Sequence, residues 1–421
     1  MNKRFLMRME NVAEPIENPI YAILFDRETG RYNLLNSEQT IIAVDVVSNL
    51  ASGTIESFFP FRVFTDLQKL YENTDILDLH SKRRDILSAP ISAYFEITER
   101  CNLKCIGCYQ GERLIGNQHP LATKQIVNFL YSFSQIGGLI VRLTGKEPTT
   151  HKSLVSIVTY GKSLGLKIAL NTNGVVGTRK IEQLVEAGIS EVVVSLDGRP
   201  ETHNQFRGAN IFDKTVNSIK VFSDLGIDTR INMTVSPANK HDIRFVAELA
   251  NNLGVYVSYI PLRNIGRATV GEVLTADDMR GIAQEIAQLR GGVNVRLLTY
   301  FDIFGEDGKS DYYHPMFQLT PCHARKNIFV SNVGNVYPCD HLVLLGDIFC
   351  GGNITQADLL DIWRNGNGLE KYRSIGISDE CTKKCQFFRK SCYGGCGSET
   401  LLETKGQCSV LSCDRLCPKS V

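Results

Sequence analysis

The sequence predicts an α/β protein in which parallel strands are joined by helices, with a smaller domain on either side. Between about residues 90 and 300, short β-rich runs alternate with amphipathic stretches, which is the pattern of repeated βα units. Glycine follows several of these stretches, as at Gly188, Gly226 and Gly254, where it suits the end of a helix. Ten of the 13 cysteines come after residue 321. They define a cysteine-rich C-terminal part.

The N-terminal segment, residues 1–88, is predicted to form a β-hairpin followed by helices. Residues 21–26 and 31–35 are β-rich and flank a Glu-Thr-Gly turn. Residues 36–39 have the signature of a helix N-terminus, and apolar residues recur with helical spacing up to residue 50. A second helix is expected over residues 63–71. This order of elements resembles a small winged-helix domain.

The middle segment is predicted to contain six parallel strands. The expected strands are residues 91–98, 139–143, 167–171, 191–196, 228–235 and 255–260. The expected helices include residues 123–134, 181–187, 212–225 and 241–253. Such strands are joined by right-handed crossovers. In a barrel and in an open doubly wound sheet alike, the binding site forms at the C-terminal ends of the strands.

Composition and charge exclude several classes of function. A chain of 421 residues, 43% of them hydrophobic, is long enough for two or three domains. Lysine and arginine (46) balance aspartate and glutamate (45), so the net charge is +1 and we expect neither nucleic acid nor a membrane as partner. There is no run of 18 apolar residues and no signal-peptide core, so a cytoplasmic location is expected. Thirteen cysteines in such a chain indicate metal or cluster binding rather than disulfides.

Three cysteines directly follow the first strand of the middle segment. Cys101, Cys105 and Cys108 have the spacing Cys-x3-Cys-x2-Cys. Thiolates are the soft ligands that iron–sulfur clusters prefer, and a [4Fe–4S] cluster needs four donors. Three thiolates therefore leave one iron open to a small molecule. A zinc knuckle is the alternative, although zinc sites usually show paired cysteines rather than a lone triplet.

The spacing of this triplet and its place after a strand resemble the radical S-adenosylmethionine (radical SAM) superfamily. The resemblance implies a partial (β/α)6 barrel of the TIM type over residues 89–312. It also implies that the open iron binds SAM and that the reduced cluster cleaves SAM into methionine and a 5′-deoxyadenosyl radical. The superfamily normally has an aromatic residue before the last cysteine. Here Gly107 stands at that position, and Tyr109 is the candidate to stack on adenine.

Polar residues at the ends of the later strands complete the expected SAM site. The run Thr144-Gly145-Lys146-Glu147-Pro148 resembles the superfamily's Gly-Gly-Glu-Pro motif, in which the glutamate binds the SAM amino group, with Lys146 in place of the second glycine. The resemblance also implies contacts to the ribose and carboxylate of SAM. The residues expected to make them are Asn171, Asn173, Ser195, Asp197, Asn232 and Thr234. Any one of these is equally suited to a helix N-cap or a turn.

The C-terminal segment, residues 313–421, resembles the SPASM extension of radical SAM enzymes, which holds auxiliary [4Fe–4S] clusters. It has a Cys-x11-Gly-x4-Cys arrangement, then Cys-x3-Cys-x6-Cys-x3-Cys, which departs slightly from the usual spacing. By resemblance, the first auxiliary cluster takes Cys322, Cys339 and Cys396, with Cys350 as a candidate fourth ligand. The second takes Cys381, Cys385, Cys392 and one of Cys408, Cys413 and Cys417, with Cys417 preferred. A pair of zinc ribbons is the alternative.

Together these resemblances imply a radical SAM peptide maturase with SAM and three [4Fe–4S] clusters. The N-terminal segment resembles the leader-binding domain of enzymes that modify ribosomally made peptides; a structural cap is its alternative. The expected partners are a precursor peptide with a leader and a flavodoxin or ferredoxin electron donor. Hydrogen abstraction would yield a crosslink (C–C or thioether), epimerisation or backbone excision. The alternatives are an anaerobic sulfatase-maturase-type enzyme that forms formylglycine, and a non-catalytic zinc-stabilised peptide-binding scaffold.

Overall fold

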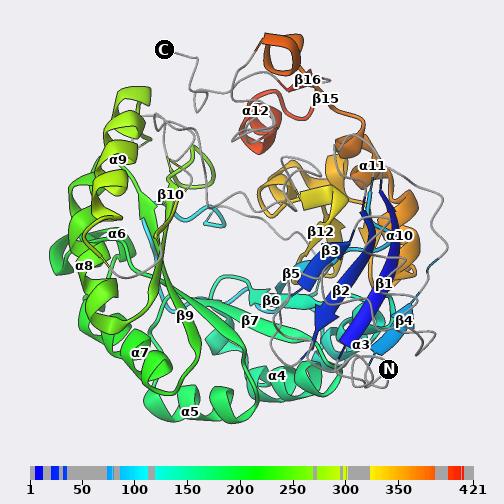
Figure 1. The fold of residues 1–421 in the computed structure, drawn as a ribbon, viewed down its shortest axis with the longest axis horizontal. Helices are drawn as coiled ribbons and strands as arrows, with labels where there is room; N and C mark the ends of the chain where they lie inside the picture. The colour runs from blue at the N-terminus through cyan, green and yellow to red at the C-terminus, as the bar shows by residue number, and fades with distance from the viewer. Residues whose placement is uncertain are drawn as a thin grey trace, which may run out of the picture.

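A ten-stranded mixed sheet organises the computed structural model of the protein (Figure 1). The strand order is β11-β10-β9-β8-β7-β6-β5-β12-β13-β14. A separate four-stranded sheet lies near the N-terminus, and β15 (Gly376–Ile377) pairs with β16 (Val410–Leu411). The structure describes residues 5–12, 20–27, 32–35, 74–77, 79, 86–111, 119–268, 273–293, 297–299, 301, 323–384, 397–408 and 410–411.

The parallel strands of the middle segment follow one another in sequence order across the sheet. They are β5 (Ser92–Glu96), β6 (Ile140–Thr144), β7 (Lys167–Thr172), β8 (Glu191–Ser195), β9 (Asp228–Val235), β10 (Tyr256–Pro261) and β11 (Leu297–Thr299). Each strand pairs in parallel with the next. The six strands predicted from the sequence are therefore confirmed, with ends that shift by at most a few residues. The short strand β11 was not predicted.

Helices cover one face of these strands (Figure 1). They are α3 (Thr123–Gln135), α4 (Leu154–Ser163), α5 (Thr178–Glu186), α6 (Pro200–Arg207), α7 (Phe212–Asp224), α8 (Ile243–Leu253) and α9 (Ala276–Leu289). The four helices predicted from the sequence are α3, α5, α7 and α8, and all four are confirmed. The sequence pattern missed α4, which is rich in β-branched residues, and α6, which buries only His203.

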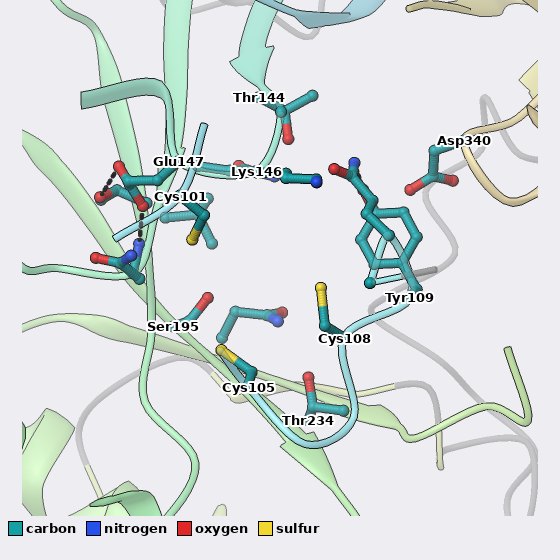
Figure 2. A pocket seen from close by; sticks show the side chains of 18 of the residues that line it. Cys101, Cys105, Cys108, Tyr109, Thr144, Lys146, Glu147, Ser195, Thr234 and Asp340 are labelled. Atoms are coloured by element: carbon teal, nitrogen blue, oxygen red, sulfur yellow. Dashed lines mark hydrogen bonds between the residues drawn. The ribbon is translucent and has the colours of Figure 1, made fainter. Parts of the chain in front are cut away.

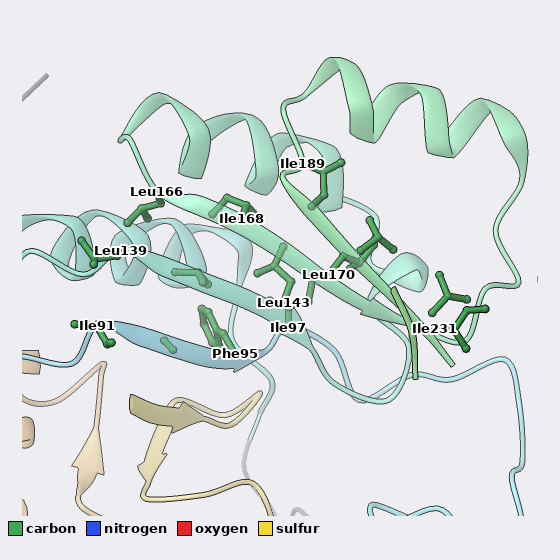
Figure 3. Close-up of a cluster of buried hydrophobic side chains, with 14 of the residues drawn as sticks. Ile91, Phe95, Ile97, Leu139, Leu143, Leu166, Ile168, Leu170, Ile189 and Ile231 are labelled. Carbon is green, nitrogen blue, oxygen red and sulfur yellow. The ribbon is translucent and has the colours of Figure 1, made fainter. Parts of the chain in front are cut away.

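Strand side chains alternate between two faces with different chemistry. On the face toward the helices, Phe95, Leu143 and Leu170 are fully buried (Figure 3), and the Phe95 ring packs edge-on against Phe129 of α3. We call the opposite face the inner face. Its side chains are mostly polar or charged, and they include Tyr94, Arg142, Asn171, Ser195, Arg230, Asn232 and Thr234. The apolar face holds the helices in place, so the inner face is available for binding.

The N-terminal sheet has the order β3-β2-β1-β4. Its strands are β1 (Phe5–Val12), β2 (Ile20–Asp26), β3 (Tyr32–Leu35) and β4 (Thr74–Leu77). The antiparallel pairing of β2 with β3 confirms the predicted hairpin. The sequence pattern missed β1 and β4, and the helices expected over residues 36–50 and 63–71 lie outside the described residues.

A buried ion pair attaches this sheet to the middle segment. Arg8 of β1 is 1% exposed and pairs with Glu10 at 2.6 Å. The Arg8 guanidinium also donates to the main-chain oxygens of Ala89 and Gly137, at 2.9 and 2.8 Å. Glu10 accepts from the main-chain N–H of Ser88 at 2.6 Å. The two charged residues of β1 therefore act as structural links rather than as a solvated surface.

The first strands of the C-terminal segment extend the central sheet. Strand β12 (Asn327–Val330) pairs in parallel with β5, and β13 (Asn335–Tyr337) and β14 (Gly352–Asn353) follow as antiparallel neighbours. Helices α10 (Leu359–Asn365), α11 (Asn367–Arg373) and α12 (Gly397–Glu403) come later. The buried Trp363 donates to the Leu87 carbonyl at 2.8 Å, which ties α10 to the start of the middle segment. Among the residues described, no helix has the length and apolar character needed to cross a bilayer.

Removal of the Glu10 carboxylate should destabilise the fold. In a Glu10→Ala variant, Arg8 stays buried without its counter-charge, so we expect the free energy of unfolding to fall by about 3 kcal/mol. Urea denaturation measures this change. Asp224→Ala is the matched control, because it removes a carboxylate from the exposed Lys220–Asp224 pair, where the expected loss is below about 0.5 kcal/mol. Equal losses in the two variants would contradict a linking role for Glu10.

Candidate functional site

A cavity of about 930 Å³ lies at the C-terminal ends of the parallel strands and extends along the inner face. It contains the three predicted cluster cysteines and most of the predicted SAM contacts. The predicted residues that line it are Cys101, Cys105, Cys108, Tyr109, Gly145, Lys146, Glu147, Asn171, Asn173, Ser195, Asn232 and Thr234. Pro148 and Asp197 are buried behind the wall. Residues from separate strand ends thus meet at one site, as expected for parallel strands.

The loop that carries the three cysteines is held by main-chain contacts from the last turn of α6 and from the loop that follows β10. The N–H of Ile106 donates to the Phe206 carbonyl at 2.9 Å, and the N–H of Arg267 donates to the Cys108 carbonyl at 3.1 Å. Gly266 has φ +71°, and a Cβ there would lie 2.4 Å from the Tyr109 carbonyl oxygen, so only glycine permits this approach. Figure 2 shows the side chains of Cys101, Cys105 and Cys108 around one common space.

The three sulfur atoms lie farther apart than the sulfur ligands of a single zinc ion. A zinc ion with Zn–S bonds of about 2.3 Å brings its sulfur ligands within about 4 Å of one another. In the described part of the chain, the one group of three such ligand atoms within 4.8 Å is Cys339, Asp340 and His341, so the triplet is wider than this. Burial raises the pKa of the Cys101 and Cys108 thiols. Metal loading must therefore displace protons from these thiols.

A buried ion pair places a cation beside one of these sulfurs. Arg207 of α6 donates through Nε to the fully buried Asp197 carboxylate at 2.6 Å. Its Nη1 lies 3.8 Å from the Cys105 sulfur. Asp197 also accepts from the main-chain N–H of Thr234 at 3.0 Å. Asp197, predicted as a SAM contact, thus lies behind the wall, where it orients Arg207 beside the Cys105 sulfur.

The Glu147 carboxylate joins the loops that follow β6 and β7. It is fully buried and accepts from Thr149 Oγ1 at 2.6 Å, Thr172 Oγ1 at 2.8 Å and the main-chain N–H of Asn173 at 2.8 Å (Figure 2). Burial raises its pKa even though these hydrogen bonds favour the ionised form. Figure 2 also shows the Lys146 side chain extending into the space between Glu147 and Tyr109. This wall therefore carries both a fixed carboxylate and a cation.

Phe206 explains why glycine stands at position 107. A Cβ on Gly107 would lie 2.9 Å from Cζ of Phe206 and 3.0 Å from Cδ1 of Leu262, so the Phe206 ring already occupies that space. Phe206 lines the cavity. Tyr109 instead packs edge-on against His341, with ring centroids 5.6 Å apart. The sequence reasoning missed Phe206, although a glycine in place of the usual aromatic residue signals that another element supplies the ring.

Further charged or titratable residues line the cavity without having been predicted as site residues, among them Arg142, Arg230, Asp340 and His341. Neither arginine belongs to a recognisable sequence motif. Only the two-residue alternation of strand side chains could have placed them on the inner face. Asp340 and His341 directly follow Cys339, which was itself predicted as a cluster ligand.

The predicted auxiliary ligands are only partly described. Cys339 is buried and lines the same cavity, and Cys350 is half-buried. For Cys381 the structure describes the main chain alone. The remaining predicted ligands lie outside the described residues, and they are Cys322, Cys385, Cys392, Cys396, Cys413 and Cys417. The ligand sets of the auxiliary clusters therefore stay predictions.

A strand-end loop with three cysteines on an α/β sheet defines a class of cluster-binding protein, and sequence comparison identifies it. The radical SAM superfamily matches residues 95–250, and the SPASM iron–sulfur cluster-binding domain matches residues 322–393. The AdoMet-dependent heme synthase of Methanosarcina barkeri is 29% identical over 326 residues, which cover 73% of this chain and 91% of the relative. The mycofactocin maturase MftC of Mycolicibacterium smegmatis is 27% identical over 323 residues, which cover 74% and 79%.

Among solved structures, Streptococcus suis SuiB bound to S-adenosylmethionine has the same fold. The TM-score is 0.73 at 17% identity, and the match covers 96% of this chain and 99% of SuiB. The chain is a radical SAM enzyme that carries a SPASM domain. These two domains imply SAM and iron–sulfur clusters as cofactors.

Stability should fall on acidification because of His203 on α6. Its side chain is fully buried, and Nδ1 accepts the main-chain N–H of Asp197 at 3.1 Å. Burial lowers its pKa from 6.5 to about 4. Between these values the unfolded chain binds the proton and the folded chain does not, so the contribution is complete above pH 6.5 and is lost as pH falls. At pH 5 the loss is about 2 kcal/mol.

A His203→Asn variant tests this assignment. The asparagine amide oxygen retains an acceptor near the Asp197 N–H but does not titrate. The free energy of unfolding of the variant should therefore fall less steeply between pH 7 and pH 5 than that of the wild type, by about 2 kcal/mol. Parallel pH profiles for the two proteins would show that His203 is not responsible.

Proposed function

We propose that the protein is a peptide maturase that abstracts hydrogen from a ribosomally made precursor peptide. The observation that carries the proposal is the convergence of the Cys101, Cys105 and Cys108 thiols with polar strand-end residues in one cavity of about 930 Å³. The same cavity reaches Cys339 of the SPASM segment. A site of this kind accommodates both a cofactor and part of a larger substrate.

The three cysteines of the loop are the proposed ligands of the catalytic [4Fe–4S] cluster. With SAM bound, a reduced cluster of this type supplies a 5′-deoxyadenosyl radical that abstracts a hydrogen atom. Arg207, at 3.8 Å from the Cys105 sulfur, offsets the negative charge of the thiolates. The contacts of Arg267 with Cys108 and of Gly266 with Tyr109 hold the loop that carries these cysteines. A flavodoxin or ferredoxin is the proposed electron donor.

The surrounding wall is the proposed SAM site. One side of this wall is proposed to receive the amino and carboxylate groups of SAM, and it consists of Gly145, Lys146, Glu147 and Pro148. Glu147 supplies the negative charge that the ammonium group of SAM requires. Phe206 and Tyr109 offer aromatic surface to the adenine. The proposed polar contacts to the rest of SAM are Asn171, Asn173, Ser195, Asn232 and Thr234, all of which line the cavity. Asp197 acts through the residues it holds in place.

The finer architecture follows from the same proposal. Residues 89–312 form a partial (β/α)6 barrel, supported by the sequence order of the strands from β5 to β11. Residues 313–421 form the SPASM domain, with two auxiliary [4Fe–4S] clusters and three clusters in all. Because Cys339 lines the cavity, an auxiliary cluster there would face the substrate. Such a cluster is suited to accept the electron left after hydrogen abstraction.

The N-terminal segment, residues 1–88, is the proposed leader-binding domain. Strand β3 lies at the edge of its sheet, and an extended peptide can pair with such an edge. The match to SuiB leaves only about 17 of the 421 residues outside it, so it reaches into this segment. SuiB has also been solved bound to its precursor peptide SuiA.

The proposed product of the reaction is a C–C or thioether crosslink, an epimerised residue or an excised backbone segment.

A second candidate function is chemistry on a tetrapyrrole. The heme synthase of Methanosarcina barkeri shares 29% identity with the chain, slightly more than the maturase MftC does. By sequence, the heme synthase and MftC match nearly equal shares of this chain, 73% and 74%. The structural match to SuiB, which has been solved with a precursor peptide, covers 96% and so includes the N-terminal sheet, which favours a peptide substrate. Analysis of the modified peptide also distinguishes a peptide maturase of this kind from the sulfatase-maturase-type alternative, whose product is formylglycine.

The cluster assignment predicts how SAM cleavage responds to loss of one thiol. Cys105→Ala should reduce 5′-deoxyadenosine formation by about 100-fold or more under anaerobic, dithionite-reduced conditions, because two thiolates hold the cluster poorly. Chromatography quantifies the product. Ser163→Ala is the matched control, since Ser163 is exposed on α4 and does not line the cavity, and its rate should stay within about twofold. Normal cleavage by a folded Cys105→Ala protein would refute the assignment.

A further inference from the structure

Two arginines lie deep on the inner face, well below the cysteine loop. Arg142 of β6 and Arg230 of β9 both line the cavity. Arg142 precedes the strand-end residue Thr144 by two positions and Arg230 precedes Thr234 by four, which corresponds to about 7 and 13 Å along the strands. These two cations therefore lie on the floor of the cavity rather than at its mouth.

Positive charge exceeds negative charge around these arginines. Glu191 is shared by three cations: Arg142 at 2.8 Å, Arg230 at 3.6 Å and Lys167 at 3.7 Å. Burial raises the pKa of Glu191, but the three cations outweigh this and lower the pKa to about 2. The other carboxylate of the cluster, Asp228, is exposed to solvent. Three cations thus face two carboxylates, and the surplus charge is most directly met by an anion from outside the chain.

Arg142 and Arg230 differ in how far their donors are satisfied. Arg142 donates to Glu191 at 2.8 Å and to Asn171 Oδ1 at 3.3 Å, and its guanidinium lies over the Tyr94 ring. Arg230 has its 3.6 Å ion pair with Glu191, and its buried Nε has no hydrogen-bond partner among the described residues. A guanidinium carries five N–H donors in a planar fork that matches a carboxylate. Arg230 is therefore the group that lacks acceptors.

Two of the cations nearer the cavity mouth, Arg207 and Arg267, are already engaged by the cysteine loop or by Asp197. Arg207 pairs with Asp197 and reaches Cys105, and Arg267 donates to the Cys105 carbonyl at 3.2 Å. The carboxylates that line the cavity all lie on segments beyond the strand ends, and they are Glu99, Glu147 and Asp340. Among the lining residues, the floor thus offers two cations and no carboxylate.

We propose that Arg230, supported by Arg142, binds a carboxylate of the peptide segment that enters the cavity, so that the enzyme selects peptides that are acidic at this position. The carboxylate belongs either to an Asp or Glu side chain or to the C-terminus of the peptide. This inference rests on the proposed function and specifies its substrate class. Glu191 retains Arg142 and Lys167 when Arg230 is replaced, so the fold should tolerate the substitution.

Equilibrium binding of short peptides to the reconstituted holoenzyme with SAM tests the proposal without requiring turnover. The probes are acetyl-Ala-Glu-Ala-amide, acetyl-Ala-Gln-Ala-amide, acetyl-Ala-Ala-Ala with a free carboxylate, and coproporphyrin III, which carries propionates. Wild-type enzyme should bind one of the charged peptides about 10-fold more tightly than the Gln peptide, by titration calorimetry. The tighter of the two identifies the source of the carboxylate.

Three variants complete the test. In Arg230→Gln, the affinities for the charged and the neutral peptide should lie within about twofold of each other. Arg230→Lys should retain part of the preference for the charged peptide. Arg244→Gln, on the exposed side of α8, should bind the peptides as the wild type does. Thermal melting checks each fold. Absent or equal peptide binding by wild type, or a preference that survives in Arg230→Gln, overturns the proposal. Arg230-dependent binding of coproporphyrin III alone also overturns it.

The SAM cleavage assay on the same preparations tests the carboxylate site and the proposed maturase function separately. Wild-type enzyme that cleaves SAM but shows no carboxylate preference refutes the role of Arg230 and leaves the maturase proposal standing. Enzyme that prefers the charged peptide but forms no 5′-deoxyadenosine supports the carboxylate site and refutes the proposed chemistry.

Discussion

The two-residue alternation of side chains along the parallel strands is the constraint on which the rest of the structure depends. On one face, residues such as Leu143 and Leu170 bury their side chains against the helices and hold the sheet together. The other face is thereby free to carry Arg142, Arg230 and the polar strand-end residues into a single cavity. Stability and binding are thus divided between alternate residues of the same strands, and the loops beyond the strand ends meet at one edge.

The cysteine loop shows how a segment without regular structure is fixed at that edge. Main-chain contacts from the last turn of α6 and from the loop after β10 hold it, and the close approach of Gly266 to Tyr109 leaves no room for a side chain. The buried Asp197 positions Arg207 beside the Cys105 sulfur. These contacts fix the main chain of the loop, and a fixed main chain keeps the cysteine side chains close to one geometry.

Features with a local signal could be predicted from the sequence, and features set by tertiary contacts could not. The six strands and the cysteine triplet are each encoded within a few residues. Strand β1 was missed because Arg8 and Glu10 look solvated until their buried partners are known. The ring of Phe206 beside Gly107 and the inward position of Arg230 depend on contacts between distant segments. The sequence placed Asp197 near the site, but it could not show that the carboxylate of Asp197 is buried behind the cavity wall.

The central claim is that Cys101, Cys105 and Cys108 hold a [4Fe–4S] cluster at the edge of the sheet. The most direct test is the iron and sulfide content of anaerobically reconstituted protein, compared with a variant in which all three cysteines are replaced by alanine. The account predicts about twelve irons in the wild type and about four fewer in the variant. Bound zinc with little iron, or equal iron in both proteins, would contradict it.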